Sequence, residues 1–294
     1  MKRERLAVLP PRDAILAGAL LLACGLITVC DVAAEDTAST VGPACRAEGG
    51  VLVHVVNSSL QAGPTEIRVL LPDKLDENRK YPCLYLLPVE AGAGQHYGDG
   101  MRAARRWNLA NRFQIICVLP TFSALPWYCD HPSDPTLQQE SYFLRVVIPH
   151  VEAAYPVGPT ASSRLLVGFS KSGWGAFSLL LRHPETFARA AAWDAPLMAA
   201  QPNRFGMGPI FGTQENFDQY RLTSLVQQQA SALRDSPRLI HLGYGNFRKD
   251  HVDFERLLLE NDIPHQFHDG PQRTHDWDSG WLLEAVQGLL PSSE

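Results

Sequence analysis

The chain has 294 residues and a net charge of −5, and 45% of its residues are hydrophobic while 19% are charged. This composition is typical of a packed globular protein and excludes wholesale disorder. The weakly acidic charge, with no run of basic residues, lacks the electrostatic signature of a nucleic-acid-binding protein. We therefore expect no nucleic-acid partner.

The first 34 residues are typical of an export signal. Basic residues gather before Asp13, an apolar run extends from Ala14 to Val29, and the small residues Val32-Ala33-Ala34 offer a peptidase site. The apolar run is shorter than the roughly 20 residues that a membrane span needs. We predict a signal peptide at 1–34 and an exported protein, periplasmic or extracellular. An uncleaved anchor, or a lipoprotein at Cys24, is the alternative, and only then do we expect membrane contact.

Four cysteines remain in the predicted mature chain. No pair of them has C-x-x-C spacing, which argues against zinc binding or thioredoxin-like chemistry. Cys83 and Cys117 lie in strand-like apolar runs and are expected to be buried, whereas Cys45 and Cys129 lie in predicted loops and could pair. We expect no metal and no cofactor.

The rest of the chain alternates between strand and helix patterns. Residues 35–50 are small and polar and are predicted to be a flexible leader, followed by a single domain at 51–294. The predicted strands are Val51–Val56, Thr65–Leu71, Cys83–Leu87, Ile115–Leu119, Leu165–Phe169, Ala188–Trp193, Leu239–Gly243 and His265–His268. The predicted helices are Gly100–Arg112, Gln138–Ala154, Gly173–Arg182, Leu222–Arg234, Val252–Asn261 and Ser279–Leu290.

This order predicts an α/β protein. Helices separate the last six strands, which favours one mostly parallel, eight-stranded sheet with helices on both faces. The first two strands are expected at an antiparallel edge. Two long segments, Pro120–Pro135 and Asp194–Tyr220, have no regular pattern, and long loops in a compact domain are usually functional.

The strongest chemical signal is a serine between a predicted strand and a predicted helix, in the run Gly168-Phe169-Ser170-Lys171-Ser172-Gly173. A serine on such a tight turn holds its hydroxyl above the sheet edge, and the turn has room only for small neighbours. The N–H of the following residue, Lys171, would then point at a developing oxyanion. The alternative is a serine that merely caps the helix, and we favour the nucleophile.

A serine nucleophile needs a general base. In this architecture the chain order is serine, acid, histidine, with the histidine after the last strand. His275 follows the last predicted strand and precedes the last predicted helix, so it is the candidate base. His265 and His268 are three residues apart on a strand, a spacing that does not place them side by side for a metal.

These residues resemble the esterase D-like, or putative-esterase, branch of the α/β-hydrolases, which includes S-formylglutathione hydrolases, feruloyl and acetylxylan esterases and mycolyltransferases. The resemblance extends from about Thr65 to Leu290. It is carried by Lys80–Leu87, Gly168–Ala176, His183–Phe187, Leu258–His265 and His275–Trp277. It implies an α/β-hydrolase fold and a serine hydrolase that cleaves a carboxylic ester, with Ser170 and His275 in the active site.

The chain departs from the family pattern in three places. Ser172 stands where the elbow usually has glycine, and Pro88-Val89-Glu90 replaces the usual His-Gly. The N–H after that His-Gly completes the oxyanion hole in the family, so the resemblance assigns this position to Glu90, whose carboxylate would be repulsive unless it points away. Asn246 stands where the acid normally follows the seventh strand, and an amide cannot stabilise an imidazolium as a charge can.

Two other carboxylates are candidates for the acid. Asp194 follows the sixth predicted strand directly, an arrangement similar to that of some lipases of this fold. Asp250 lies where a later helix begins and has a plausible role as a helix cap. We favour Asp194, with Asp250 as the alternative acid.

Several aromatic residues lie in the same part of the sequence. Trp127, Trp174 and Trp277 are candidates for a platform that binds a sugar or a phenolic group, although aromatic residues more often serve packing. The sequence thus predicts a secreted serine esterase that acts through an acyl-enzyme on Ser170, on a small-molecule or carbohydrate-linked ester. The alternative is a non-catalytic binding protein on a hydrolase scaffold.

Overall fold

The structure, a computed structural model, describes residues 39–243 and 245–290. The predicted signal peptide lies outside these residues, so cleavage and export stay predictions. No helix in the described part of the chain is long and apolar enough to cross a membrane.

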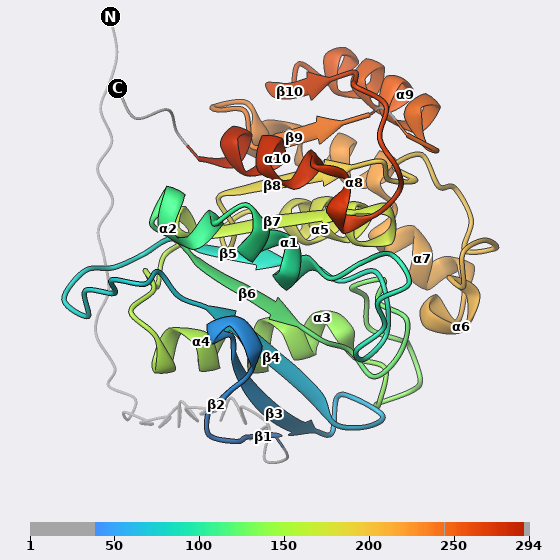
Figure 1. Ribbon diagram of the computed structural model, residues 1–294. Helices are drawn as coiled ribbons and strands as arrows, with labels where there is room; N and C mark the ends of the chain where they lie inside the picture. The colour runs from blue at the N-terminus through green and yellow to red at the C-terminus, as the bar shows by residue number, and fades with distance from the viewer. Residues whose placement is uncertain (1–38, 244, 291–294) are drawn as a thin grey trace, which may run out of the picture. The chain divides into compact units, whose positions relative to one another are not determined.

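A ten-stranded sheet occupies the centre of the described residues (Figure 1). Its spatial order is β1-β3-β4-β6-β5-β7-β8-β9-β10, and β2 also pairs with β3. The strands are β1 Ser39–Val41, β2 Cys45–Arg46, β3 Leu52–Ser58, β4 Thr65–Leu70, β5 Cys83–Leu86, β6 Ile116–Pro120, β7 Arg164–Phe169, β8 Arg189–Trp193, β9 Leu239–Leu242 and β10 His265–His268. From β6 to β10 all neighbours are parallel, which confirms the mostly parallel sheet.

The antiparallel edge is larger than the sequence predicts. Strands β3 and β4 pair antiparallel, and the segment predicted to be a flexible leader adds β1, β2 and the short helix η1 (Glu48–Gly50) beside them. Residue Thr40 is paired with Asn57, and Cys45 with Val53. These pairings cover the N–H and C=O groups that β3 would otherwise expose as an edge strand.

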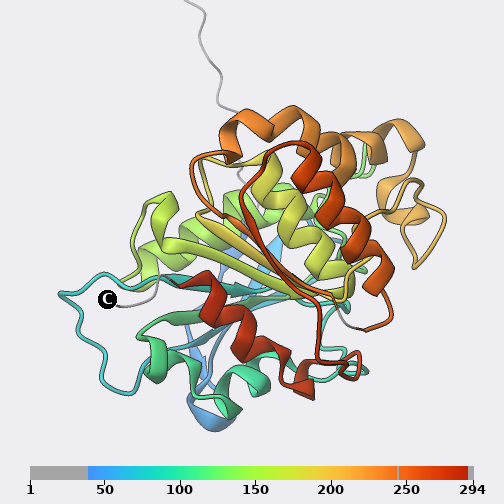
Figure 2. The same cartoon turned by 90° about the horizontal axis from the view of Figure 1, so that it is seen from above.

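Helices cover both faces of the sheet (Figure 2). One layer contains α1 Gly100–Arg106, α2 Leu109–Phe113, η5 Trp277–Ser279 and α10 Trp281–Leu289. The other layer contains α3 Gln139–Tyr142, η2 Phe143–Val147, α4 Ile148–Ala154, α5 Ser170–Arg182, α6 Gly208–Phe211, α7 Gln214–Tyr220, α8 Leu222–Gln229, η4 Ala230–Leu233 and α9 Arg248–Glu260. The short helix η3, Ala161–Ser163, precedes β7.

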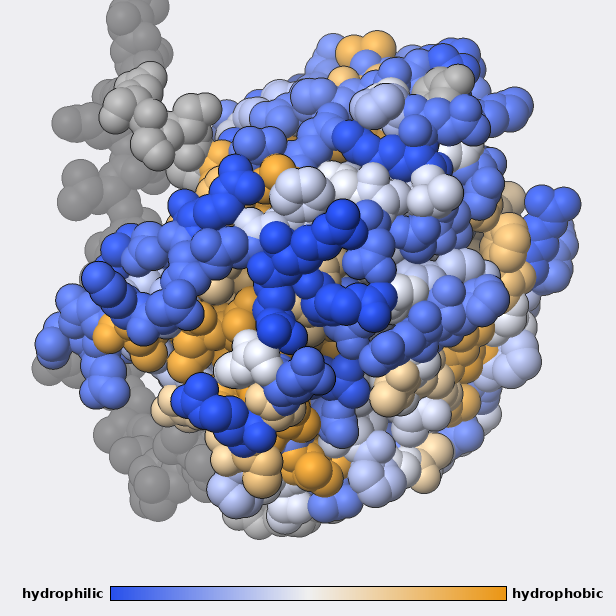
Figure 3. Space-filling view, viewed as in Figure 1, coloured by the Kyte–Doolittle hydropathy of each residue, from blue (hydrophilic) through white to orange (hydrophobic). Residues whose placement is uncertain are grey.

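Alternating strand residues build the two cores. In β5, Leu84 and Leu86 pack in the core under α1 and α10, whereas Cys83 and Tyr85 pack in the core under α5. Successive side chains of a strand point to opposite faces, so a strand covered on both sides must be apolar throughout. The outer surface seen in Figure 3 is mostly hydrophilic, and its apolar side chains lie in separate patches.

Two element predictions need correction. The helix expected at Gly100–Arg112 is two helices, because Asn108 has φ 51° and interrupts the helical backbone between α1 and α2. The segment Asp194–Tyr220, expected to be irregular, contains α6 and α7. Helices α6 and α7 are so short that hydrophobic periodicity over a long window does not detect them.

The four cysteines among the described residues are free thiols. Cys83 and Cys117 are buried in the central strands, as predicted, and burial raises the pKa of Cys117 to about 12. Cys45 is exposed on β2, whereas Cys129 is buried in the core, so the two thiols that could pair lie in different environments.

Candidate active site

Ser170 lies at the turn that joins β7 to α5. Its φ of 51° is in the left-handed region, and its exposed fraction is 9%. A Cβ atom at Gly168 would lie 2.5 Å from the backbone of Ser172, and one at Gly173 would lie 2.9 Å from the Cβ of Ala195. The turn is therefore closed so tightly that only glycine fits at residues 168 and 173, the geometry of a nucleophile elbow.

Ser172, where the family usually has glycine, has a role in this turn. Its buried hydroxyl accepts a hydrogen bond from the N–H of Phe169 at 3.1 Å and donates one to the carbonyl of Phe169 at 2.9 Å. These bonds join the first turn of α5 to the residue before the nucleophile. The departure from glycine thus leaves the elbow intact.

Asp194 binds both of the other candidate catalytic residues. It follows β8, its φ is 42°, and its backbone carbonyl accepts the N–H of Ser170 at 3.2 Å. Its carboxylate is fully buried, and Oδ2 lies 2.6 Å from Nδ1 of His275. The N–H groups of Asn246 and Phe247 donate to the same carboxylate at 2.9 and 2.6 Å.

This arrangement fixes the tautomer of His275. A carboxylate can only accept, so Nδ1 of His275 carries the proton and Nε2 is left with a lone pair. Aromatic rings surround the imidazole: the ring of Phe169 is 5.1 Å from it between centroids, that of Tyr97 5.7 Å, that of Phe247 5.9 Å and that of Trp193 6.0 Å. His275 is therefore held in place as a base whose Nε2 is available to accept a proton.

Asp250, the alternative acid, contacts a different group. Its carboxylate accepts the N–H of Met198 at 3.1 Å, and burial raises the pKa of this carboxyl group. It lies in the first turn of α9, whose N-cap is Phe247, so it does not cap that helix as the sequence suggested. The structure brings Asp194, and not Asp250, to His275.

The turn after β9, where the family has its acid, contributes backbone N–H groups that bind the Asp194 carboxylate. A Cβ atom at Gly245 would lie 2.2 Å from Oδ2 of Asp194, so this glycine leaves room for the carboxylate. Sequence reasoning noted Asn246 only for its side chain, whereas the structure uses its N–H and that of Phe247. The one signal in the sequence was the glycine directly before Asn246.

The two candidate oxyanion residues follow neighbouring strands, Glu90 after β5 and Lys171 after β7. Lys171 is in the first turn of α5, where N–H groups have no acceptor within the helix. Glu90 follows β5, and its carboxylate accepts the N–H of Tyr97 at 3.1 Å. Burial lowers the pKa of Lys171, and the Glu90 carboxylate opposes that shift. The negative charge of Glu90 is thus partly compensated by Tyr97 and Lys171.

The loop before Glu90 is held from the opposite side by Tyr128, whose buried hydroxyl donates to the carbonyl of Pro88 at 2.6 Å. Sequence reasoning noted Tyr128 only as an aromatic neighbour of Trp127 in an irregular loop, and not as a support for the loop before Glu90. Tyr128 lies in the irregular segment Pro120–Pro135 that the sequence marked as functional, and its φ of 56° is in the left-handed region.

The predicted tryptophan platform needs correction. Trp127 and Trp174 are fully buried in one core with their rings 5.6 Å apart, and Trp277 is 2% exposed in the other core. Rings that are covered by protein offer no face to a substrate. The partly exposed aromatic residues near His275 are instead Tyr97 and Phe247.

Fold and site together define a serine hydrolase of the α/β-hydrolase type. The family described as "Putative esterase" matches residues 58–261, more than half of the chain. The chain belongs to this family, and it is a carboxylic ester hydrolase. Comparison with curated protein sequences gives no match.

Solved structures share this fold. The fluorophosphonate-binding serine hydrolase FphF of Staphylococcus aureus is 18% identical, with a TM-score of 0.66 over 85% of this chain and 100% of that chain. An S-formylglutathione hydrolase from Agrobacterium tumefaciens is 17% identical, with a TM-score of 0.65 over 85% and 99%. A ferulic acid esterase is 20% identical, with a TM-score of 0.61 over 81% and 95%. At these identities the similarity concerns the fold.

Proposed function

We propose that the protein hydrolyses its ester through an acyl-enzyme on Ser170, with His275 as general base and Asp194 as the orienting acid. One observation carries the assignment. Asp194 binds Nδ1 of His275 with its carboxylate and the N–H of Ser170 with its carbonyl, so one residue ties the base to the nucleophile.

The chemistry follows from these positions. The Oγ of Ser170 attacks the ester carbonyl while His275 takes the hydroxyl proton on Nε2, and the alcohol leaves with that proton. A water molecule then attacks the acyl-enzyme, again giving a proton to His275, and the acid is released as Ser170 recovers its proton. The buried charge of Asp194 stabilises the imidazolium that forms in both steps.

The oxyanion would be held by N–H groups of Lys171 and Glu90. Two backbone donors at this position are the usual arrangement in the fold, and the helix N-terminus adds a favourable partial charge. The hydrogen bond from Tyr97 and the proximity of Lys171 reduce the repulsion from the Glu90 carboxylate. We therefore propose that the altered oxyanion loop is functional.

A groove beside the triad supports a carbohydrate-linked substrate. The groove has a volume of about 550 Å³, and its lining includes Phe205, Phe247, Asn203, Arg204 and Asp250. Phe247 also packs against His275, so one wall of the groove adjoins the base, and the two phenylalanine rings are 5.5 Å apart. Aromatic faces mixed with hydrogen-bonding side chains suit a sugar. Export through residues 1–34 is part of this proposal, because extracellular carbohydrate esters would then be accessible.

The nucleophile is tested with purified Ser170→Ala. The variant should lose essentially all turnover of p-nitrophenyl acetate and all labelling by a fluorophosphonate probe. Ser162→Ala, on the short helix η3 away from the elbow, is the control and should behave as the wild type. Unchanged turnover in Ser170→Ala would overturn the assignment. A wild-type protein inert toward both reagents would favour the binding-protein alternative.

The sugar preference is tested at the groove. Phe205→Ala should raise KM for an acetylated xylo-oligosaccharide several-fold and leave turnover of p-nitrophenyl acetate unchanged. Phe205 is 47% exposed, so its removal should cost little stability. Leu259→Ala, which truncates another exposed apolar side chain, is the control. Equal KM values in all three proteins would count against a sugar in this groove.

A further inference from the structure

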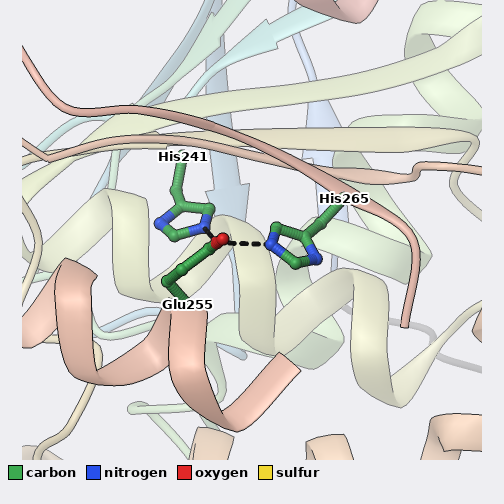
Figure 4. A group of neighbouring side chains, drawn as sticks. All are labelled: His241, Glu255 and His265. Atoms are coloured by element: carbon green, nitrogen blue, oxygen red, sulfur yellow. Dashed lines mark hydrogen bonds and ion pairs between the residues drawn. The ribbon is translucent and has the colours of Figure 1, made fainter. Parts of the chain in front are cut away.

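Four polar side chains connect the turn at Asp194 to the outer edge of the sheet. They are His251 and Glu255 on α9, His241 on β9 and His265 on β10. Figure 4 shows the outer three, with the rings of His241 and His265 both directed at the Glu255 carboxylate. None of the four takes part in the mechanism above.

The inner end of this chain is next to the triad acid. Nε2 of His251 accepts the N–H of Ala195 at 2.8 Å, and both residues are fully buried. Ala195 directly follows Asp194, whose φ of 42° is in the left-handed region. The hydrogen bond therefore acts on a strained turn that non-glycine residues seldom adopt.

The Ala195 bond determines where the protons lie. A backbone amide can only donate, so Nε2 of His251 must accept, and burial lowers the pKa of His251 well below its ordinary value. The neutral ring then carries its proton on Nδ1, which lies 3.3 Å from Nδ1 of His241. His241 accepts there, and burial lowers its pKa to about 4, so its own proton is on Nε2.

Glu255 and His265 lie at the outer end of this chain of side chains, beyond His241. Nε2 of His241 lies 3.3 Å from the Glu255 carboxylate, close enough for electrostatic attraction but without the alignment of a hydrogen bond. Nδ1 of His265 lies 2.7 Å from the carbonyl of Ile263 and therefore carries a proton, while its Nε2 also contacts Glu255. A bare nitrogen and a carboxylate repel one another, so this contact requires a second proton between them.

The same three side chains also have the spacing of a metal site. Ligand atoms of His241, Glu255 and His265 all lie within 4.8 Å of one another. A zinc ion would need the lone pair of Nε2 in His241, where the proton count places a hydrogen. If that hydrogen moved to Nδ1 of His241, it would face the N–H at Nδ1 of His251. If His251 then moved its own proton to Nε2, that N–H would face the N–H of Ala195. The geometry thus favours protons over a metal.

We propose that His251 is a positioning residue for Asp194, held in its accepting tautomer by His241, Glu255 and His265. The proposal rests on the proposed role of Asp194 in catalysis. By fixing the N–H of Ala195, His251 keeps the Asp194 carboxylate directed at His275, so it acts on catalysis through Asp194 and touches no substrate.

The tautomers are measured directly in the wild-type protein. Nuclear magnetic resonance of protein with nitrogen-15 in its histidines should show a protonated Nδ1 in His251 and a protonated Nε2 in His241. The reverse pattern in either ring would overturn the proposed arrangement of protons. This measurement needs no activity, so it is independent of whether the proposed function is correct.

Matched amides test the effect on catalysis. In His251→Gln the amide oxygen can reach the position of Nε2 and accept from Ala195, whereas in His251→Asn the shorter amide occupies only the position of Nδ1. We expect His251→Asn to lower kcat about tenfold with little change in KM, the scale of one lost hydrogen bond, and His251→Gln to restore most of it. His268→Gln, on the exposed end of β10, is the control.

Two further readouts separate positioning from folding. The downfield proton resonance of Nδ1 in His275 should shift in His251→Asn and return in His251→Gln. Equal kcat values for the two variants, or an unchanged resonance in His251→Asn, would overturn the proposal. A purified wild-type protein that contains one zinc ion per chain, lost in His265→Asn, would also overturn the proposal. The proposed arrangement of protons leaves no lone pair on Nε2 of His241 to bind that ion.

Discussion

Gly245 lies so close to Asp194 that a Cβ atom at residue 245 would be 2.2 Å from Oδ2 of the carboxylate. The contact joins two turns, one after β8 and one after β9, that are 51 positions apart in the chain. The carboxylate occupies the place that a side chain at residue 245 would fill. The acid from one strand and the glycine from the next are therefore a matched pair.

Gly245→Ala should impair catalysis, because the new methyl group must displace the carboxylate from His275. We expect kcat to fall by at least about tenfold, with most of the loss in kcat and little in KM. Gly63→Ala is the control, since a Cβ atom there would meet nothing within 4 Å. Steady-state kinetics with p-nitrophenyl acetate decide the matter, and wild-type kcat in Gly245→Ala would contradict the packing described above.

Asp194→Asn should lower kcat by about 10⁴-fold, the scale seen when a triad carboxylate becomes an amide and the histidine tautomer is disturbed. The variant keeps the size of the side chain, so circular dichroism should show an unchanged fold. Burst kinetics should locate the loss in acylation.

Asp250→Asn is the matched control for that experiment. Its carboxylate holds the N–H of Met198 and does not contact His275, and an amide oxygen can still accept that bond. We expect kcat within about twofold of the wild type. A large loss in Asp250→Asn together with a small one in Asp194→Asn would reverse the assignment of the acid.

Ser172→Gly tests the serine that replaces the family's glycine. The variant loses two hydrogen bonds to Phe169 and gains backbone freedom in the unfolded chain. The free energy of unfolding in urea should fall by about 1–2 kcal/mol, while kcat stays within about twofold. Ser172→Ala separates the two causes, because it removes the hydroxyl and keeps the Cβ atom. A Ser172→Gly protein as stable as the wild type would show that the two hydrogen bonds between Ser172 and Phe169 contribute nothing to stability.

Stability should fall as the solution becomes acidic. Burial lowers the pKa of His241 to about 4, so the folded protein keeps this ring neutral at a pH where the unfolded chain, with an ordinary pKa of about 6.5, already binds a proton. The contribution is fully present above about pH 7 and is lost between about 6.5 and 4, amounting to roughly 3 kcal/mol. Urea unfolding at several pH values measures it. His251, whose pKa burial also lowers, contributes to the same slope, so His241→Phe should reduce the slope without abolishing it. An unchanged slope would contradict the prediction.

Much of the fold was predictable because the sheet is covered on both faces. Apolar runs such as Cys83–Leu87 and Leu165–Phe169 can only be central strands in such a protein, and both are. The two strands before residue 50 were missed, because runs of only three and two exposed or half-exposed residues carry no periodic signal. Their pairing depends on the open edge of β3, which exists only once the sheet has formed.

The candidate site was predictable in its side chains and not in its backbone. Ser170 was identified from its place between a predicted strand and a predicted helix, His275 from chain order, and Asp194 from its place after a strand. The N–H groups that hold Asp194 could not be read from residue types, because every residue except proline has one. The tryptophan platform was expected because large rings lay near the motif, yet their burial depends on packing from other elements.

The hydrogen bond from the N–H of Ser170 to the carbonyl of Asp194 has a mechanical consequence. It joins the ends of adjacent parallel strands, β7 and β8, so the nucleophile and the acid are two points on one stiff piece of backbone. A distortion that displaces one of them displaces the other in the same direction. Gradual warming or dilute denaturant should therefore not produce a population with a working base and a misplaced serine. Reactivity toward the fluorophosphonate probe and the His275–Asp194 proton signal should instead disappear together, in a single step.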